Sequence, residues 1–224
     1  MPSIYLIRHG QASLGADDYD NLSDLGHRQA QRLGEYLAQK GIAPAAVFMG
    51  SLRRHAQTWA GIAQGLDAAQ LPAPVVRTGL NEYDSDAVIR ATCTEAHARP
   101  TTPEARRAHF RRLRAGLQQW ASGAVTPEGM PPYRDFAQGV ADVLTQVRES
   151  CTGDVFIVSS GGPIGTAVAQ TLGASPEAFI ELNMRIRNTA VTELHYTPKR
   201  HALHTFNTLP HLDAAEFADC VTYA

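Results

Sequence analysis

The sequence IYLIRHGQ, residues 4–11, decides how the rest of the chain is organised. Its four apolar residues predict a short buried strand. The strand ends in a charged pair, Arg8 and His9, followed by Gly10. An arginine at a strand end needs an anion or other acceptors, and ligands of open α/β sheets bind just beyond the carboxyl ends of the strands. We therefore expect Arg8 and His9 to face an anionic ligand.

Composition excludes several classes of protein. The chain has 224 residues and a formal net charge of -2, which gives no reason to expect nucleic-acid or membrane partners. No apolar run is long enough for a membrane span, and the N-terminus has no signal-like segment. The three cysteines, Cys93, Cys151 and Cys220, lack metal-ligand spacing. They indicate reduced thiols and a cytoplasmic protein.

Strands and helices are expected to alternate along the chain. Helical spacing follows the N-cap candidate Ser23 up to Gly41, and this pattern of βαβ units predicts a mostly parallel sheet. The fold class is therefore a three-layer α/β/α sandwich. The expected strands are 4–7, 46–49, 75–76, 154–158, 189–196 and 202–206, and the expected helices are 23–41, 51–66, 104–120, 133–150 and a last one ending near 172.

The pattern changes between about residues 84 and 150, where we expect a helical insertion within a single domain spanning 1–224. The segment is rich in arginine. A solvated helix face is the favoured interpretation, and a basic wall that selects a charged substrate is the alternative. The arginines are Arg99, Arg106, Arg107, Arg111, Arg112 and Arg114.

Several predicted strand ends carry residues that suit a phosphoryl group. Guanidinium groups match phosphoryl oxygens bidentately, and free N–H groups at a helix start favour anions. The candidates are Arg8 and His9, Arg54 at the start of a helix, Glu82 after the third strand, and the turn at 160–162.

These motifs, in this order, resemble the histidine phosphatase superfamily, which includes the phosphoglycerate mutases. The Arg-His-Gly after the first strand is the defining motif of that family. The other matching segments are 21–30, 52–58 (with His55 where alanine is common), 80–82 and 188–194, together with Asn207 and 211–212.

The resemblance implies phosphoryl transfer through a phosphohistidine. His9 is then the nucleophile, and Arg8 and Arg54 neutralise the phosphoryl oxygens. Glu82 protonates the leaving alcohol and later assists the attacking water, and Gln11 is a substrate contact. No cofactor and no metal are expected, because the arginines supply the positive charge. The expected partner is a small phosphorylated substrate or a phosphoprotein.

Two positions depart from the family pattern. Ser160 stands where the family has a second active-site histidine, and Gly15 stands where mutases and many phosphatases have a phosphate-contacting asparagine. Losing one such donor typically costs about 10²–10³ in rate. The Ser160 hydroxyl and the Gly161 N–H are expected to contact the substrate instead. A phosphatase is therefore favoured over a mutase, and the alternative is a pseudophosphatase that binds a phosphorylated ligand without turnover.

Other interpretations are weaker. A nucleotide-binding turn at 161–165 with Glu181 as ribose ligand lacks the G-x-G-x-x-G spacing. Ser160 as a nucleophile lacks the G-x-S-x-G elbow. It also lacks an assignable base, because His55 neighbours Arg54 on one helix and the two side chains are expected to diverge. The remaining histidines are expected on the surface or hydrogen-bonded in the core. A homodimer through an edge strand or the insertion is conceivable from sequence but not demanded by it.

Overall fold

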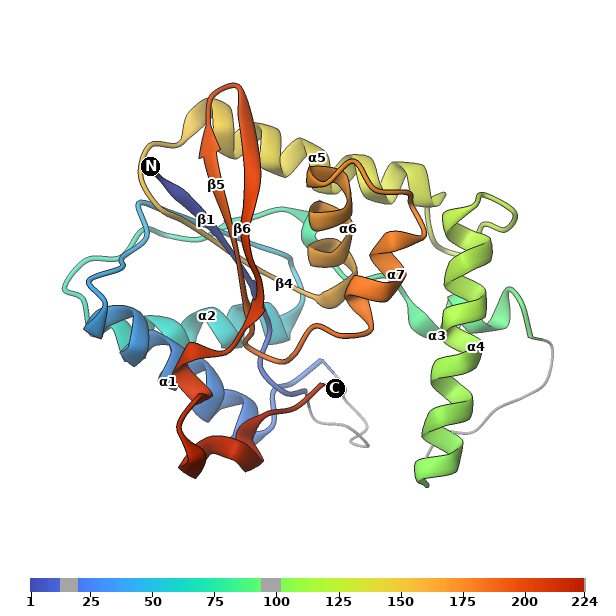
Figure 1. The fold of residues 1–224 in the computed structure, drawn as a ribbon, viewed down its shortest axis with the longest axis horizontal. Coiled ribbons are helices and arrows are strands. Elements are labelled where there is room, and N and C mark those ends of the chain that lie inside the picture. The colour runs from blue at the N-terminus through green and yellow to red at the C-terminus, as the bar shows by residue number, and fades with distance from the viewer. Residues whose placement is uncertain (13–19, 94–101, 224) are drawn as a thin grey trace.

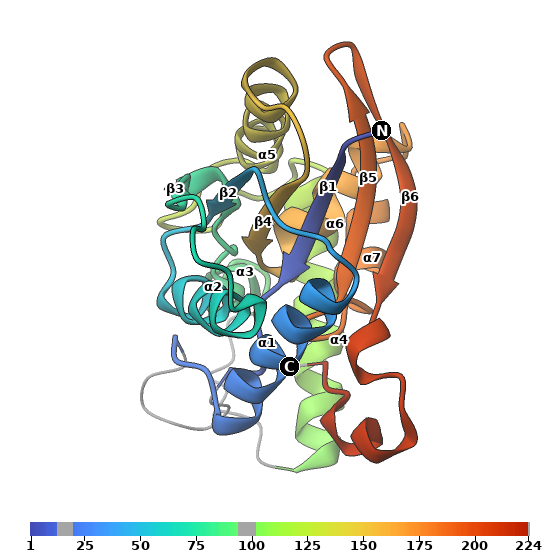
Figure 2. The ribbon, with the colours of Figure 1, turned by 90° about the vertical axis from the view of Figure 1, so that its left-hand side faces the viewer.

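The computed structural model describes residues 1–12, 20–93 and 102–223. A six-stranded sheet has the order β3-β2-β4-β1-β5-β6. β1 pairs in parallel with β4, and β2 pairs in parallel with both β4 and β3. β5 runs antiparallel to both of its neighbours, β1 and β6. The strands are β1 (Ser3–Arg8), β2 (Ala46–Met49), β3 (Val75–Val76), β4 (Val155–Ser159), β5 (Val191–Thr197) and β6 (Arg200–Thr208). The predicted mostly parallel sheet is confirmed, with β1 and β4 at its centre (Figure 2).

Helices cover both faces of this sheet. The α-helices are α1 (Asp24–Gln39), α2 (Arg53–Leu66), α3 (Ser85–Arg90), α4 (Pro103–Ala121), α5 (Tyr133–Ser150), α6 (Gly161–Thr171) and α7 (Ala178–Asn183). Short 3-10 turns lie at Thr78–Leu80, Pro210–Leu212 and Ala215–Cys220. The predicted cap of α1 is confirmed, because Ser23 Oγ accepts a hydrogen bond from the Gly26 N–H at 3.1 Å.

Side chains that alternate along the central strands contribute to a hydrophobic core on each face of the sheet. Ile4 and Leu6 of β1 pack with α5 and α6, while Tyr5 and Ile7 pack with α1 and α2. Successive side chains of a strand point to opposite faces, so one strand serves two layers of helices. The predicted three-layer α/β/α sandwich is confirmed.

The helical region at 84–150 divides into two parts. α3 and α4 pack in a separate cluster with α7 around the buried Trp120, and Figure 1 shows α4 beyond α7, away from the strands. α5 instead packs directly on the sheet through Val140, Val143, Leu144 and Val147. α5 thus belongs to a layer of the sandwich, although it falls within the segment predicted as an insertion.

The sheet brings the predicted site residues to one edge. β1, β2 and β4 run in the same direction, so their carboxyl ends lie together. His9 follows β1, Arg54 lies in the first turn of α2 after β2, and Ser160 follows β4.

Candidate active site

His9 is buried at the carboxyl end of β1, with only 3% of its surface exposed. Its Nδ1 lies 2.7 Å from the Gly10 carbonyl oxygen. A neutral ring that donates Nδ1–H to this carbonyl keeps a lone pair on Nε2. Burial, followed by the charges of Arg8 and Arg54 and by His55, holds the pKa of His9 well below its usual value. The ring is therefore neutral near pH 7, as a nucleophile must be.

Backbone contacts fix the position of His9. Its N–H donates to the Ser159 carbonyl at 2.9 Å. Its carbonyl accepts from Asn188 Nδ2 and from the Thr189 N–H, both at 3.2 Å. Thr189 has a φ of +54°, a costly conformation for a β-branched residue, and its hydroxyl lies 2.9 Å from His211 Nε2. Both Asn188 and Thr189 are fully buried, and they hold the loop that carries His9.

Gly10 is required by a close approach to α1. A Cβ at Gly10 would lie 2.5 Å from the carbonyl oxygen of Gly26, far inside van der Waals contact. The Gly10 N–H donates to Thr58 Oγ1 at 3.0 Å, and this hydroxyl donates to the Arg54 carbonyl at 2.7 Å. The first loop is thus clamped between α1 and α2.

The two arginines lie close to His9. Arg54 is 7% exposed, and its Nη1 donates to Asp20 Oδ1 at 2.9 Å. Arg8 Nη1 donates to the carbonyl oxygens of Ile186 and Tyr223. Both guanidinium groups lower the pKa of His9 and oppose the rise in that of Glu82. Two positive charges therefore surround the neutral imidazole of His9.

Glu82 reaches the start of α6. Its Oε1 and Oε2 accept from the Gly162 N–H at 3.1 and 3.2 Å, and a Cβ at Gly162 would lie 2.2 Å from Oε1. Burial raises the pKa of Glu82, and the hydrogen bond from Gly162 and the two arginines only partly oppose this. A carboxyl group with a raised pKa is suited to donate a proton.

The expectation that no histidine partners Ser160 is wrong. His55 Nε2 lies 2.8 Å from Ser160 Oγ, and both residues are completely buried. Successive residues of a helix point about 100° apart, yet the first turn of α2 sits so close to β4 that this angle still leaves both Arg54 and His55 at the site. The His55 ring centroid is 5.9 Å from that of His9.

Of the other residues predicted from the sequence, some lie beside the site and some lie away from it. Gln11 lies beside the site, but its Oε1 accepts from Ser23 Oγ at 2.8 Å, so the side chain supports the start of α1. Gly161 packs against Asn183. Glu181 is paired with Arg114 on the surface, which leaves the nucleotide interpretation without its ribose ligand. Gly15 and Arg99 lie outside the described residues.

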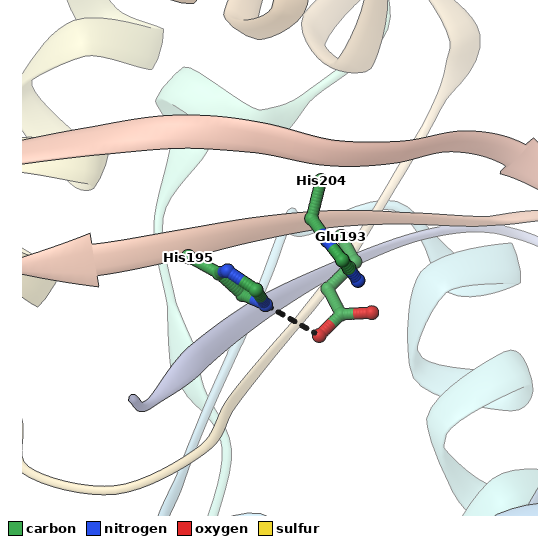
Figure 3. A group of neighbouring side chains, drawn as sticks. All are labelled: Glu193, His195 and His204. Carbon is green, nitrogen blue, oxygen red and sulfur yellow. Dashed lines mark ion pairs between the residues drawn. The ribbon is translucent and has the colours of Figure 1, made fainter.

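Within the described residues, one group of side chains has the ligand atoms of a metal site, and this group lies away from His9. Glu193 and His195 of β5 and His204 of β6 offer ligand atoms within 4.8 Å of one another (Figure 3). In the sheet register His195 pairs with Ser3 and Glu193 with Tyr5, so the group lies toward the start of β1. His9 follows the other end of that strand.

Comparison with known proteins identifies the family of this chain. The family model described as Histidine phosphatase superfamily (branch 1) matches residues 4–209. The chain belongs to the histidine phosphatase superfamily. A 2,3-bisphosphoglycerate-dependent phosphoglycerate mutase of Maricaulis maris is 38% identical over 79 residues, which cover 32% of each chain. The match thus spans about a third of that relative.

Solved structures of the superfamily share the fold. A phosphoserine phosphatase mutant from Entamoeba histolytica, in complex with phosphoserine, aligns with a TM-score of 0.65 at 17% identity over 95% of this chain and all of that one. A phosphoglycerate mutase from Bacillus anthracis gives 0.66 at 17% identity over 94% of both chains. A mycobacterial glucosyl-3-phosphoglycerate phosphatase with inorganic phosphate gives 0.66 at 21% identity over 93% of this chain and 98% of that one. Phosphatases and a mutase thus occur among the structural neighbours, which share the fold of this chain.

The described part of the chain contains no helix with both the length and the apolar character of a membrane span. Its three cysteines are free thiols, as predicted. The arginines of α4 that the structure describes lie mainly on its exposed face.

Proposed function

We propose that this protein is a metal-independent phosphatase that hydrolyses a phosphomonoester through a phosphohistidine on His9. The observation that carries the proposal is the neutral, buried His9, whose Nδ1 is engaged by Gly10 and whose Nε2 keeps its lone pair. The expected substrate is a small phosphorylated molecule or a phosphoprotein, and the site is proposed to act in the cytoplasm.

In the first step, His9 Nε2 attacks phosphorus, the bond from phosphorus to the leaving oxygen breaks, and Glu82 gives its proton to that oxygen. Arg8 and Arg54 stabilise the charge on the phosphoryl oxygens. The Arg54 guanidinium group, which donates to Asp20 Oδ1 through Nη1, is proposed to contact these oxygens as well.

In the second step, the Glu82 carboxylate takes a proton from a water molecule whose oxygen attacks phosphorus. The P–N bond breaks, phosphate leaves, and neutral His9 is restored. The raised pKa of Glu82 supports both roles, because the group gains and loses its proton closer to neutral pH than an exposed glutamate does.

The alternative is a binding protein that holds a phosphorylated ligand without turnover. It is favoured by Ser160, which on the family resemblance replaces a second histidine. The buried nucleophile and the Glu82 acid favour the enzyme, because a binding protein has no need for either.

The test is hydrolysis of 4-nitrophenyl phosphate by the wild type and by His9→Ala, with quenched-flow trapping of the phosphoenzyme. We expect His9→Ala to lose at least about 10³ in kcat. The wild type should form an acid-labile, alkali-stable phosphoenzyme. Turnover that survives His9→Ala contradicts the mechanism. A wild type that binds phosphate but hydrolyses no phosphomonoester supports the binding protein.

A further inference from the structure

The contact between His55 and Ser160 joins two elements at the centre of the site. His55 lies in the first turn of α2, and Ser160 is the residue before α6. The 2.8 Å bond between Nε2 and Oγ is shielded completely from solvent. A buried polar pair of this kind is costly unless its hydrogen bonds are well made.

The protonation of His55 determines what the pair can do. Burial, and then the charge of Arg54, lowers its pKa to about 3 against partial opposition from the Gly50 backbone. The ring is therefore neutral at physiological pH and carries a single N–H. Its Nδ1 is buried beside Gly50, whose backbone is the group that opposes the shift, but no atom of the described residues lies in hydrogen-bonding geometry with it. An unpaired buried N–H is rarer than an unpaired acceptor, so we assign the hydrogen to Nε2, from which it is donated to Ser160 Oγ.

This arrangement leaves the hydroxyl hydrogen of Ser160 available. The Ser160 side chain makes no capping bond to the α6 backbone. Arg8 pairs with Ser159 in the sheet register, and the His9 N–H donates to the Ser159 carbonyl, so Ser160 and His9 are lateral neighbours. Two residues further on, the Gly162 N–H holds Glu82. Ser160 therefore stands in the chain between Ser159, which contacts His9, and Gly162, which contacts Glu82.

We propose that His55 is a positioning residue that holds the Ser160 hydroxyl as a neutral hydrogen-bond donor to the transferring phosphoryl group. The inference rests on the proposed function. Two neutral side chains from α2 and the end of β4 then supply together the donor that the family resemblance assigns to one histidine at position 160.

Kinetics of single and double variants test the pair. Ser160→Ala and His55→Leu should each lower kcat about tenfold with little change in KM, since one neutral hydrogen bond is lost. The double variant should be no worse than either single one, because His55 acts only through Ser160. His55→Gln keeps a neutral N–H donor near Nε2 and should retain most activity. Exposed His27→Ala is the matched control.

Two outcomes overturn the proposal directly. One is a His55→Leu variant that folds and keeps full kcat, or whose loss multiplies with that of Ser160→Ala. The other is a ¹⁵N spectrum of the His55 ring that shows the hydrogen on Nδ1. In that case Ser160 donates to His55 and is unavailable to the phosphoryl group.

Moving the imidazole from position 55 to position 160 is a sharper test. Both are fully buried, so an imidazole added by Ser160→His collides with the His55 ring in a close-packed interior. The single variant should be less stable and less active than Ser160→His combined with His55→Ala. Equal stability and activity of the two variants contradict the pairing.

Failure of the proposed function is distinguishable from failure of this inference. Should the wild type hydrolyse no phosphomonoester, binding of inorganic phosphate is measured by calorimetry. Ser160→Ala and His55→Leu should then weaken phosphate binding by a similar factor, whereas His55→Gln should not. Unchanged binding in Ser160→Ala overturns the inference whether or not the enzyme turns over.

A second, independent inference concerns the cluster of Glu193, His195 and His204. The two imidazole rings stack with centroids 4.1 Å apart, and Glu193 Oε1 lies 3.5 Å from His195 Nε2. Ser3 Oγ donates to the same carboxylate oxygen at 2.7 Å, as the outer-shell partner of a metal-bound carboxylate does.

We infer that these three side chains bind a divalent transition metal such as Zn²⁺ and link β5 to β6. Two imidazoles and one carboxylate are a donor set that Zn²⁺ accepts. Ligand atoms around tetrahedral zinc are about 3.3 Å apart, so atoms now within 4.8 Å of one another need only small side-chain rotations.

Zinc calorimetry and thermal melting of the whole chain test this site. We expect saturable binding of one Zn²⁺ and a Tm that rises with zinc. His204→Ala should weaken binding at least about tenfold. The control is His201→Ala, on the same strand but facing the layer that holds Leu203. Non-saturating binding, or equal affinity in His204→Ala, shows adventitious zinc only and overturns the inference.

Discussion

At the scale of single residues, Glu82 gives the sharpest prediction. Glu82→Gln keeps the size of the side chain, but the glutamine amide has no acidic proton to give to the leaving oxygen. We expect kcat/KM for an alkyl phosphate, which reports only the steps up to phosphoenzyme formation, to fall by about 10²–10⁴. For 4-nitrophenyl phosphate it should fall much less, because a nitrophenolate leaves without protonation. Steady-state kinetics on both substrates measure the difference. Equal losses on the two would remove Glu82 from the role of proton donor.

Individual site residues differ in how far the sequence can predict them. Arg8, His9, Arg54 and Glu82 each follow a strand in a recognisable motif, and the structure brings them to one edge of the sheet. Their roles remain predictions. The contact of His55 with Ser160 was not predictable, because it joins residues 105 positions apart. It depends on how closely the first turn of α2 approaches β4, and no local pattern encodes that distance.

At the scale of elements, the packing of α1 on α2 depends on a glycine. A Cβ at Gly34 would lie 2.2 Å from the Ile62 carbonyl oxygen and 2.8 Å from the Gly65 Cα. We expect Gly34→Ala to destabilise the fold by about 1–3 kcal/mol, since the helices must separate and the gain in helix propensity is smaller. Urea unfolding measures this. Gly139→Ala in α5 is the milder comparison, because its added Cβ would lie 3.2 Å from the Gly79 Cα, a tight contact but a looser one than at Gly34. A Gly34→Ala variant as stable as Gly139→Ala would contradict the close packing of α1 on α2.

Element prediction succeeded where periodicity was strong. The central strands and the cap of α1 followed from apolar runs and from Ser23. The short helix α3 was missed, because six residues are too few to show a helical period. α5 was assigned to an insertion, because its residue pattern does not say what the helix packs on. Only the contacts of Val140 and Leu144 show that it covers the sheet.

At the scale of the whole molecule, buried neutral histidines make stability depend on pH. His9, His55 and His211 all have pKa values lowered by burial above all, with those of His55 and His211 at about 3. In the unfolded chain their pKa values return to about 6.5. Below that pH the unfolded state binds protons that the folded state does not, so the free energy of unfolding falls as the pH falls.

Each of these histidines contributes a slope of about 1.4 kcal/mol per pH unit between about pH 6 and 4. Glu82 opposes them: its raised pKa adds stability that is present at low pH and lost as the pH rises through its folded value. Three groups outweigh one, so we expect urea unfolding to show a steep loss of stability from pH 6.5 to 5. His55→Leu should make the slope shallower by about 1.4 kcal/mol per pH unit. An unaltered slope in His55→Leu would mean that His55 is charged in the folded protein. In that case its bond to Ser160 would carry a positive charge to the site instead of a neutral donor.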